Sequence, residues 1–207
     1  MLKIWGRNNS INVQKVMWTV GELGLAHERI DAGGAFGGLD TEDYGARNPN
    51  RLVPVLEEPD GRVLWESNAI VRYLASVHGR GGLWPEDDFD RASVDRWMDW
   101  MVTTLHPDLT PVFWGLIRNA PAYGTPEARA PHVEKLGRAF AILDRHLADR
   151  AFVGGDTFTM GDIPVGAATY RYYALAIDHA DLPHLRRWYE SLTSRPAYAA
   201  HVMIPLT

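Results

Sequence analysis

The chain has 207 residues, of which 46% are hydrophobic and 23% are charged, and it contains no cysteine. This composition is typical of a globular protein, and the lack of cysteine excludes disulfides, thiolate metal sites and a cysteine nucleophile. The net charge of -5 gives no basic footprint for nucleic acid, and no apolar run approaches the roughly 20 residues of a membrane span. Because the N-terminus also lacks a signal-peptide pattern, we expect a soluble, cytoplasmic protein.

The first eighty residues alternate short strand patterns with helical ones. Apolar residues recur at helical spacing in two places, while Pro59-Asp60-Gly61 has turn chemistry and indicates a hairpin. Ser67 is the expected N-cap of the second helix. In chain order we predict a strand at 2–5, a helix at 13–23, a strand at 27–31, a glycine-rich loop at 33–38, strands at 53–57 and 62–65, and a helix at 69–77.

Strand patterns stop after the glycine-rich residues 79–82. Apolar stripes then predict helices at 94–105 and 133–147, after Thr159, and at 185–192 before Pro196. His106-Pro107 is expected to end or kink the first of these. The change in pattern indicates a first domain at residues 1–79, a linker at 80–87 and a second domain at 88–207.

The segment Phe158-Thr159-Met160-Gly161-Asp162 reads as a capping box. The Thr159 hydroxyl would accept a hydrogen bond from the Asp162 amide, and the Asp162 carboxylate would reach back to the start of the helix. Phe158 and Ile163 would flank the box as a hydrophobic staple. We expect this segment to start a buried helix.

Three segments together resemble the cytosolic glutathione S-transferases. Asn48-Pro49-Asn50-Arg51-Leu52-Val53-Pro54-Val55-Leu56 and Glu66-Ser67-Asn68-Ala69-Ile70 are similar to the glutathione-binding segment of that family, and residues 158–162 are similar to its helical capping box. The resemblance extends over nearly the whole chain in order and spacing. It implies the fold of this family: a thioredoxin-like α/β domain of order βαβ-ββα, followed by an all-α domain.

The resemblance assigns Leu52, Val53, Pro54, Glu66 and Ser67 to glutathione binding. Glutathione can add to a sheet edge as a short strand, and a cis Pro54 would turn the Val53 main chain toward its cysteinyl group. An ordinary trans proline opening a strand is the alternative. Where a strand meets a helix, free amides favour an anion, so Ser67 would bind the γ-glutamyl carboxylate and Glu66 the ammonium group. Simple capping is the other role open to Ser67.

The loop at residues 6–15 is where members of this family activate the glutathione thiol. A free thiol has a pKa near 8.5, and one donor plus a helix N-terminus lowers that pKa by roughly 1.3–3 units. Ser10 matches the catalytic serine of bacterial, theta- or zeta-like members, whereas Asn12 matches the asparagine of nu-class members. No tyrosine precedes Tyr44, so the tyrosine of other classes is missing. In the structural alternative, Ser10 only caps the helix and Asn12 fills its first turn.

The second-substrate pocket would lie in the helical half. Leu105, Phe113 and Trp114 are its expected apolar walls, and Arg118 would either favour an anionic acceptor or be solvated. The resemblance also implies a homodimer, in which the first domain of one subunit packs against the second domain of its mate. No nucleic-acid or membrane partner is expected.

The implied function is that of a glutathione S-transferase. Glutathione would be the co-substrate, and its thiolate would attack a small hydrophobic electrophile, as in detoxification. No metal is expected, because the eight histidines show no metal-ligand spacing. Two alternatives stay open: a nu-type glutathione-dependent disulfide reductase, in which both thiols come from glutathione, and a non-catalytic glutathione-binding or interaction module.

Overall fold

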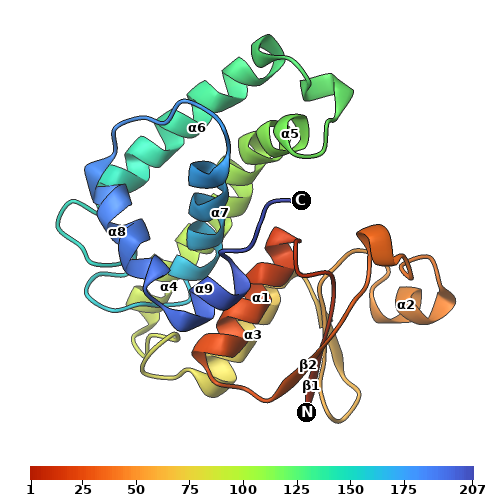
Figure 1. Ribbon diagram of the computed structural model, residues 1–207. Coiled ribbons are helices and arrows are strands. Elements are labelled where there is room, and N and C mark those ends of the chain that lie inside the picture. Colours follow the sequence, from red (N-terminus) through yellow and green to blue (C-terminus); the bar gives the residue numbers. More distant parts are fainter.

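The computed structural model describes all of residues 1–207 and has a sheet half and a helical half (Figure 1). All four strands lie in the first half, and the long elements that follow are helical. This confirms the predicted order βαβ-ββα followed by helices. The elements are β1 (Leu2–Trp5), α1 (Ile11–Glu22), β2 (His27–Ile30), α2 (Glu42–Arg47), β3 (Val55–Glu57), β4 (Val63–Trp65), α3 (Ser67–His78), α4 (Asp88–Trp100), α5 (His106–Leu116), α6 (Pro126–His146), α7 (Asp162–Ala174), α8 (Pro183–Thr193) and α9 (Pro196–His201).

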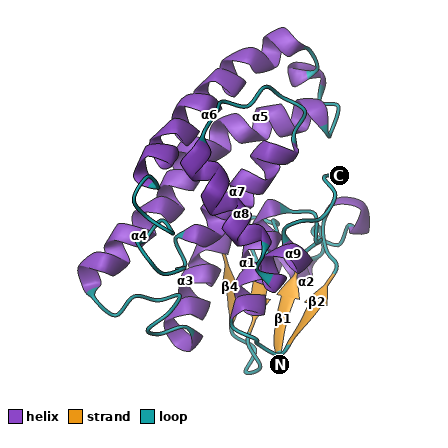
Figure 2. Cartoon of the chain, turned by 60° about the vertical axis from the view of Figure 1, so that its left-hand side comes forward, coloured by secondary structure: helices purple, strands orange, loops and turns teal.

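The sheet has the strand order β2-β1-β3-β4 (Figure 2). β1 runs parallel to β2 and antiparallel to β3, and β3 and β4 form the predicted hairpin. Alternation along β1 sends Leu2 and Ile4 to the face covered by α1 and α3. On the opposite face, Tyr44 of α2 packs in a small cluster with Val55. The sheet is therefore covered on both sides.

Helix α1 is buried on two faces. Val13, Val16 and Val20 belong to the core under the sheet. Trp18 belongs instead to the large core of the helical half, where its ring lies 4.6 Å from that of Tyr198 in an edge-on arrangement. Its indole nitrogen donates to Glu22, which also receives two hydrogen bonds from the Arg195 guanidinium. Helix α1 thus contributes to the cores of both halves and joins them.

Two details of the first half differ from the prediction. Helix α2 was not predicted, since six residues are too few to show an apolar period. Its N-terminus does carry a sequence signal, since Thr41 is a favoured N-cap residue, and the Thr41 hydroxyl accepts from the amide of Tyr44. Ser67 is not the N-cap of α3: that position belongs to Glu66, which has a φ of 70°, and Ser67 is the first helical residue.

Helices α4 and α5 are joined by a π-helical turn, Met101–Leu105, in which the amide of His106 donates to the carbonyl of Met101. Pro107 then stands in the first turn of α5. The boundary at His106-Pro107 was predicted, but the chain continues as helix through it. Pro196 ends one helical pattern, as predicted, and opens the short helix α9.

The start of α7 differs in detail from the predicted capping box. The Asp162 carboxylate reaches back to the Thr159 amide at 2.9 Å, as predicted. The Thr159 hydroxyl, however, donates to that carboxylate at 3.2 Å and does not accept from the Asp162 amide, which bonds the Thr159 carbonyl. Asp162 has no exposed surface and also accepts from the Val153 amide and the Trp188 indole, each at 3.0 Å. It therefore ties three segments of the helical half together.

Candidate active site

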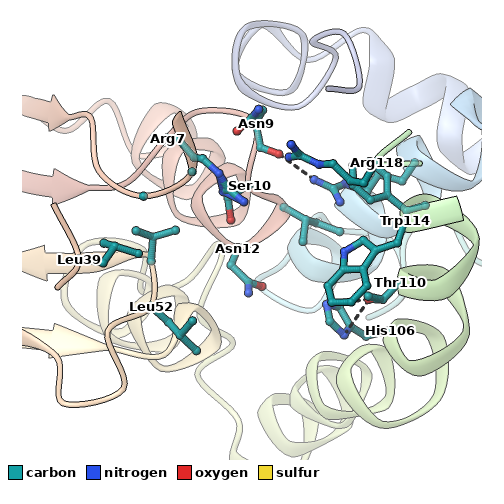
Figure 3. Close-up of a pocket in the computed structure, with 16 residues that line it drawn as sticks. Arg7, Asn9, Ser10, Asn12, Leu39, Leu52, His106, Thr110, Trp114 and Arg118 are labelled. Atoms are coloured by element: carbon teal, nitrogen blue, oxygen red, sulfur yellow. Dashed lines mark hydrogen bonds between the residues drawn. The ribbon is translucent and has the colours of Figure 1, made fainter. Parts of the chain in front are cut away.

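A cavity of about 440 Å³ lies between the sheet half and the helical half (Figure 3). One wall comes from the loops that follow β1 and β2 and the loop before β3, and the other from α5 and α7. No Asp or Glu lines it. The lining residues are Arg7, Asn9, Ser10, Ile11, Asn12, Gly33, Gly34, Leu39, Leu52, Val53, His106, Thr110, Phe113, Trp114, Arg118 and Arg171.

The β1–α1 loop brings Ser10 to the cavity. The turn out of β1 needs glycine at Gly6, whose φ is 151° and where a Cβ would lie 2.5 Å from a methyl group of Val13. Ser10 occupies the N-cap position of α1 with extended backbone, yet its side chain makes no capping hydrogen bond. Its hydroxyl therefore stands free at a helix N-terminus, where amides and the helix dipole favour a negative charge.

Asn12 lies in the first turn of α1 and contacts the start of α3. The Ser67 hydroxyl donates to Asn12 Oδ1 at 3.3 Å, and Ser67 is only 5% exposed. The Asn12 amide group can still donate, because only its oxygen is engaged. Beside them Glu66 is exposed.

The Leu52 loop is fixed by two hydrogen bonds to one carbonyl. Tyr44 Oη and Asn48 Nδ2 each donate to the Leu52 carbonyl at 2.8 Å. Burial raises the pKa of Tyr44 to about 12, so this phenol keeps its proton. The Leu52 side chain is 61% exposed at the cavity rim, and the Val53-Pro54 peptide bond is cis.

One face of α5 forms the helical wall. His106, Thr110, Phe113 and Trp114 recur at helical spacing along it, and Arg118 follows just beyond its C-terminal end. Burial, and then the nearby cations Lys15 and Arg171, lower the pKa of His106, so its imidazole is neutral at pH 7. Thr110 Oγ1 lies 3.4 Å from His106 Nδ1. Trp114 is half exposed, whereas Phe113 is buried.

Three arginines gather at one end of the cavity: Arg7, Arg118 and Arg171. Arg171 is 7% exposed, and its Nη2 donates to the Asn9 carbonyl at 3.0 Å. Burial, reinforced by Arg118 and Arg7, lowers the pKa of Arg171 to about 9, and burial and Arg118 lower that of Arg7. Arg171 therefore keeps its charge at neutral pH, and the three guanidinium groups together make this end of the cavity strongly positive.

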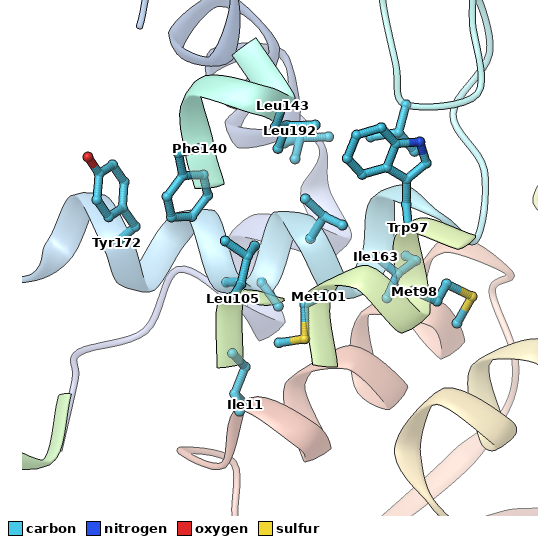
Figure 4. Close-up of a cluster of buried hydrophobic side chains, with 14 of the residues drawn as sticks. Ile11, Trp97, Met98, Met101, Leu105, Phe140, Leu143, Ile163, Tyr172 and Leu192 are labelled. Atoms are coloured by element: carbon cyan, nitrogen blue, oxygen red, sulfur yellow. The ribbon is translucent and has the colours of Figure 1, made fainter. Parts of the chain in front are cut away.

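Six of the predicted site residues line the cavity: Ser10, Asn12, Leu52, Val53, Phe113 and Trp114. Pro54, Glu66 and Ser67 adjoin it without lining it. Leu105 was wrongly predicted as a pocket wall. It has no exposed surface and packs in the core of the helical half, because the π turn directs it toward Met101 and Phe140 (Figure 4).

Four further lining residues were not predicted as site residues from the sequence: Arg7, His106, Thr110 and Arg171. The stripe from His106 to Trp114 was readable once α5 was known to begin at His106. Arg171 had no local signal, since it follows α5 by more than fifty residues and reaches the cavity only through the packing of α7. No group of three or more His, Asp or Glu side chains is placed to hold a metal ion, and no helix is both long and apolar enough to cross a bilayer.

Comparison with known proteins connects this site to one family. The model of the glutathione S-transferase N-terminal domain matches residues 9–77, and that of the C-terminal domain matches residues 126–191. The chain is 41% identical to glutathione S-transferase GstB of Escherichia coli K12 over 208 residues, with 100% of each chain covered. It is 31% identical to glutathione S-transferase 3 of Zea mays, covering 99% of this chain and 95% of that one. A theta class glutathione S-transferase from Xanthomonas axonopodis pv. citri, solved with glutathione bound, matches with a TM-score of 0.94 and 44% identity, covering 100% of this chain and 99% of that one.

Proposed function

Because the chain belongs to the glutathione S-transferase family, we propose that it activates glutathione through Ser10 and transfers the thiolate to an electrophilic carbon. In this reaction the sulfur forms a new C–S bond, the leaving group departs with its bonding electrons, and the thiol proton passes to solvent. No covalent enzyme intermediate is needed. Catalysis consists of positioning and of electrostatic stabilisation of the thiolate.

Glutathione would lie along the wall formed by the sheet half. The Val53 main chain would pair with the cysteinyl group, with Leu52 and Pro54 shaping the edge on either side. The start of α3 would bind the γ-glutamyl carboxylate through its free amides, and Glu66 would bind the ammonium group. The Ser67 hydroxyl would contact the same carboxylate by leaving Asn12, to which it donates at 3.3 Å.

The free Ser10 hydroxyl is the observation that carries the assignment. A serine that only capped α1 would accept a hydrogen bond from the first turn, and Ser10 makes no such bond. Asn12 is the second candidate donor, since its oxygen accepts from Ser67 and its NH2 group is left to donate to the thiolate. A charge-assisted hydrogen bond contributes about 1.5–3 kcal/mol, which corresponds to a fall of roughly one to two units in the thiol pKa.

The second substrate would lie against Phe113 and Trp114, which present aromatic surface from α5. We also propose a homodimer, supported by exposed apolar side chains on the edge strand β4 (Val63, Trp65) and on α4 (Phe89, 79% exposed). Sedimentation velocity tests this assembly. A cytoplasmic location completes the proposal, since the reaction consumes a reduced thiol.

The test compares Ser10→Ala with Asn12→Ala. The pKa of bound glutathione is measured from the ultraviolet absorbance of its thiolate across pH, and turnover is measured with 1-chloro-2,4-dinitrobenzene. In the wild-type protein the bound thiol should titrate well below 8.5. Ser10→Ala should raise that pKa by about one to two units and lower turnover, with little change in glutathione affinity. Ser10→Thr, which keeps a hydroxyl, should restore both values.

Thermal unfolding of each variant separates chemistry from capping, because the loss of a cap alone costs about 1 kcal/mol. A folded Ser10→Ala protein with an unchanged thiol pKa would remove Ser10 from the mechanism. If Asn12→Ala raised the pKa instead, Asn12 would be the thiol donor.

A further inference from the structure

The cavity is positive although the chain as a whole carries a net charge of -5. Arg7, Arg118 and Arg171 line it, and no Asp or Glu does. The positive charges repel one another, since Arg118 and Arg7 both lower the pKa of Arg171. Such an arrangement is unfavourable unless an anion joins it.

Arg171 is the most confined of the three. Its side chain is 7% exposed, its Nη2 donates to the Asn9 carbonyl, and no protein group accepts a hydrogen bond from its Nε. An Nη atom of Arg7 is likewise buried without a partner. A buried cation that lacks an acceptor costs free energy that a ligand oxygen would recover. Both unsatisfied atoms belong to residues that line the same cavity.

The position of the pair Arg118 and Arg171 indicates which ligand they would bind. Their guanidinium carbons lie 5.8 Å and 4.3 Å from the ring centroid of Phe113, so both cations flank one pocket aromatic. Arg118 stands beside Trp114 on the α5 wall, across the cavity from Leu39 and Leu52 (Figure 3). The pair thus belongs to the wall of the second substrate and not to the sheet edge proposed for glutathione. Arg7 projects from the sheet half and packs against Gly34.

We propose that Arg118 and Arg171 bind the carboxylate of a small anionic second substrate whose apolar body lies against Phe113 and Trp114. This inference rests on the proposed transferase function and narrows its substrate class to electrophiles that carry a carboxylate. A guanidinium fork matches a carboxylate in geometry, and its charge favours the anion over a neutral amide of the same shape. The carboxylate holds the electrophilic carbon near Ser10, where the thiolate forms.

The test uses two aromatic chlorides that differ in charge, 4-chloro-3-nitrobenzoate and 4-chloro-3-nitrobenzamide. In each, the glutathione thiolate forms a C–S bond to the chlorinated carbon and chloride leaves with the C–Cl electron pair. The kcat/KM of each substrate is divided by its uncatalysed rate with glutathione at the same pH, because the two rings differ in intrinsic reactivity. The ratio of these values, anion to amide, measures the charge preference.

The wild-type protein should prefer the anion by at least about tenfold, and Arg118→Gln and Arg171→Met should each lower the preference by roughly 10- to 100-fold. Arg118 is exposed, so its variant should remain folded even if Arg171→Met does not. Arg186→Gln is the matched control: Arg186 also lies 4.3 Å over an aromatic ring, that of Tyr173, but it does not line the cavity. It should leave the preference unchanged.

Binding measurements separate this proposal from the transferase function. With S-methylglutathione in the glutathione site, calorimetry compares 3-nitrobenzoate with 3-nitrobenzamide, neither of which can react. If the benzoate binds more tightly than the benzamide and Arg118→Gln weakens its binding, the anion site is supported, whether or not the chlorides are turned over. A failure to turn over either chloride would count against the transferase function alone. Equal turnover and equal binding of the charged and neutral compounds would overturn the anion site and leave the transferase intact. A loss of glutathione affinity in Arg118→Gln, with the charge preference retained, would assign the arginines to glutathione and also overturn the proposal.

Discussion

Replacing Asp162 with alanine should destabilise the protein through the donors that it leaves behind. The buried carboxylate accepts from the amides of Val153 and Thr159 and from the indole of Trp188, at 2.9–3.0 Å. None of these three donors can rotate to a new partner. A buried donor without an acceptor costs about 1–3 kcal/mol, so three cost roughly 3–9 kcal/mol.

A part of that cost is offset, because the variant no longer buries a charge. Burial raises the pKa of Asp162 from 3.8 to about 6, which corresponds to about 3 kcal/mol against the ionised form. Taking the middle of the donor range, we expect Asp162→Ala to lower the free energy of unfolding by about 3 kcal/mol at pH 7. The Thr159 hydroxyl is a mobile donor, so the control Thr159→Val should cost only about 1 kcal/mol.

Urea unfolding, followed by tryptophan fluorescence and circular dichroism, measures both variants. The pH dependence gives a second readout, since a raised pKa in the folded state means that the folded protein binds more protons between pH 4 and 6. The stabilisation linked to Asp162 is then complete below pH 4 and is lost as the pH rises through 6. The gap between wild type and Asp162→Ala should therefore widen as the pH falls from 6 to 4. A loss below 1 kcal/mol at pH 7, or one equal to that of Thr159→Val, would refute this reasoning.

Two further predictions concern Lys15 and Gly115. Lys15 is 2% exposed and donates to Asn68 at 2.9 Å, and burial lowers its pKa to about 7. The unfolded chain therefore binds more protons than the folded protein between pH 7 and about 10, so the free energy of unfolding should rise over that range. In urea unfolding at several pH values, Lys15→Met should remove a rise of up to about 1.4 kcal/mol per pH unit, and an unchanged slope would contradict this origin. At Gly115 a Cβ would lie 2.1 Å from the Tyr123 carbonyl oxygen, so Gly115→Ala should destabilise by about 2 kcal/mol or more in the same assay. The control Gly137→Ala, in α6 with open space around its Cβ, should instead stabilise by up to about 1 kcal/mol, and equal effects at the two sites would count against the steric argument.

The elements predicted well are those whose signal is local and periodic. The alternation in β1, the turn at 59–61 and the apolar stripes of the long helices depend on neighbours in sequence, and the structure has each of them. The short helix α2 and the N-cap of α3 were missed or misassigned, because their form depends on contacts with the sheet and on the unusual backbone of Glu66. Local pattern does not encode such contacts.

The candidate site divides along the same line. Ser10, Leu52 and Val53 belong to contiguous segments that resemble a known family, and they line the cavity. Arg171 was not predicted as a site residue, and Leu105 was predicted wrongly as a pocket wall. Arg171 comes to the cavity by the packing of α7 on α5, and Leu105 leaves it because one π turn changes the direction of the side chains that follow.

That turn also links the length of the chain to the shape of the cavity. Successive residues of an α-helix are about 100° apart around its axis, so one residue more or fewer in Met101–Leu105 would rotate all of α5 by about that angle. The stripe of Thr110, Phe113 and Trp114 would then leave the cavity together, and a different set of side chains would replace it. Insertions and deletions in this short segment are thus a route by which relatives of this protein could exchange an entire pocket wall in one step, without a series of separate substitutions.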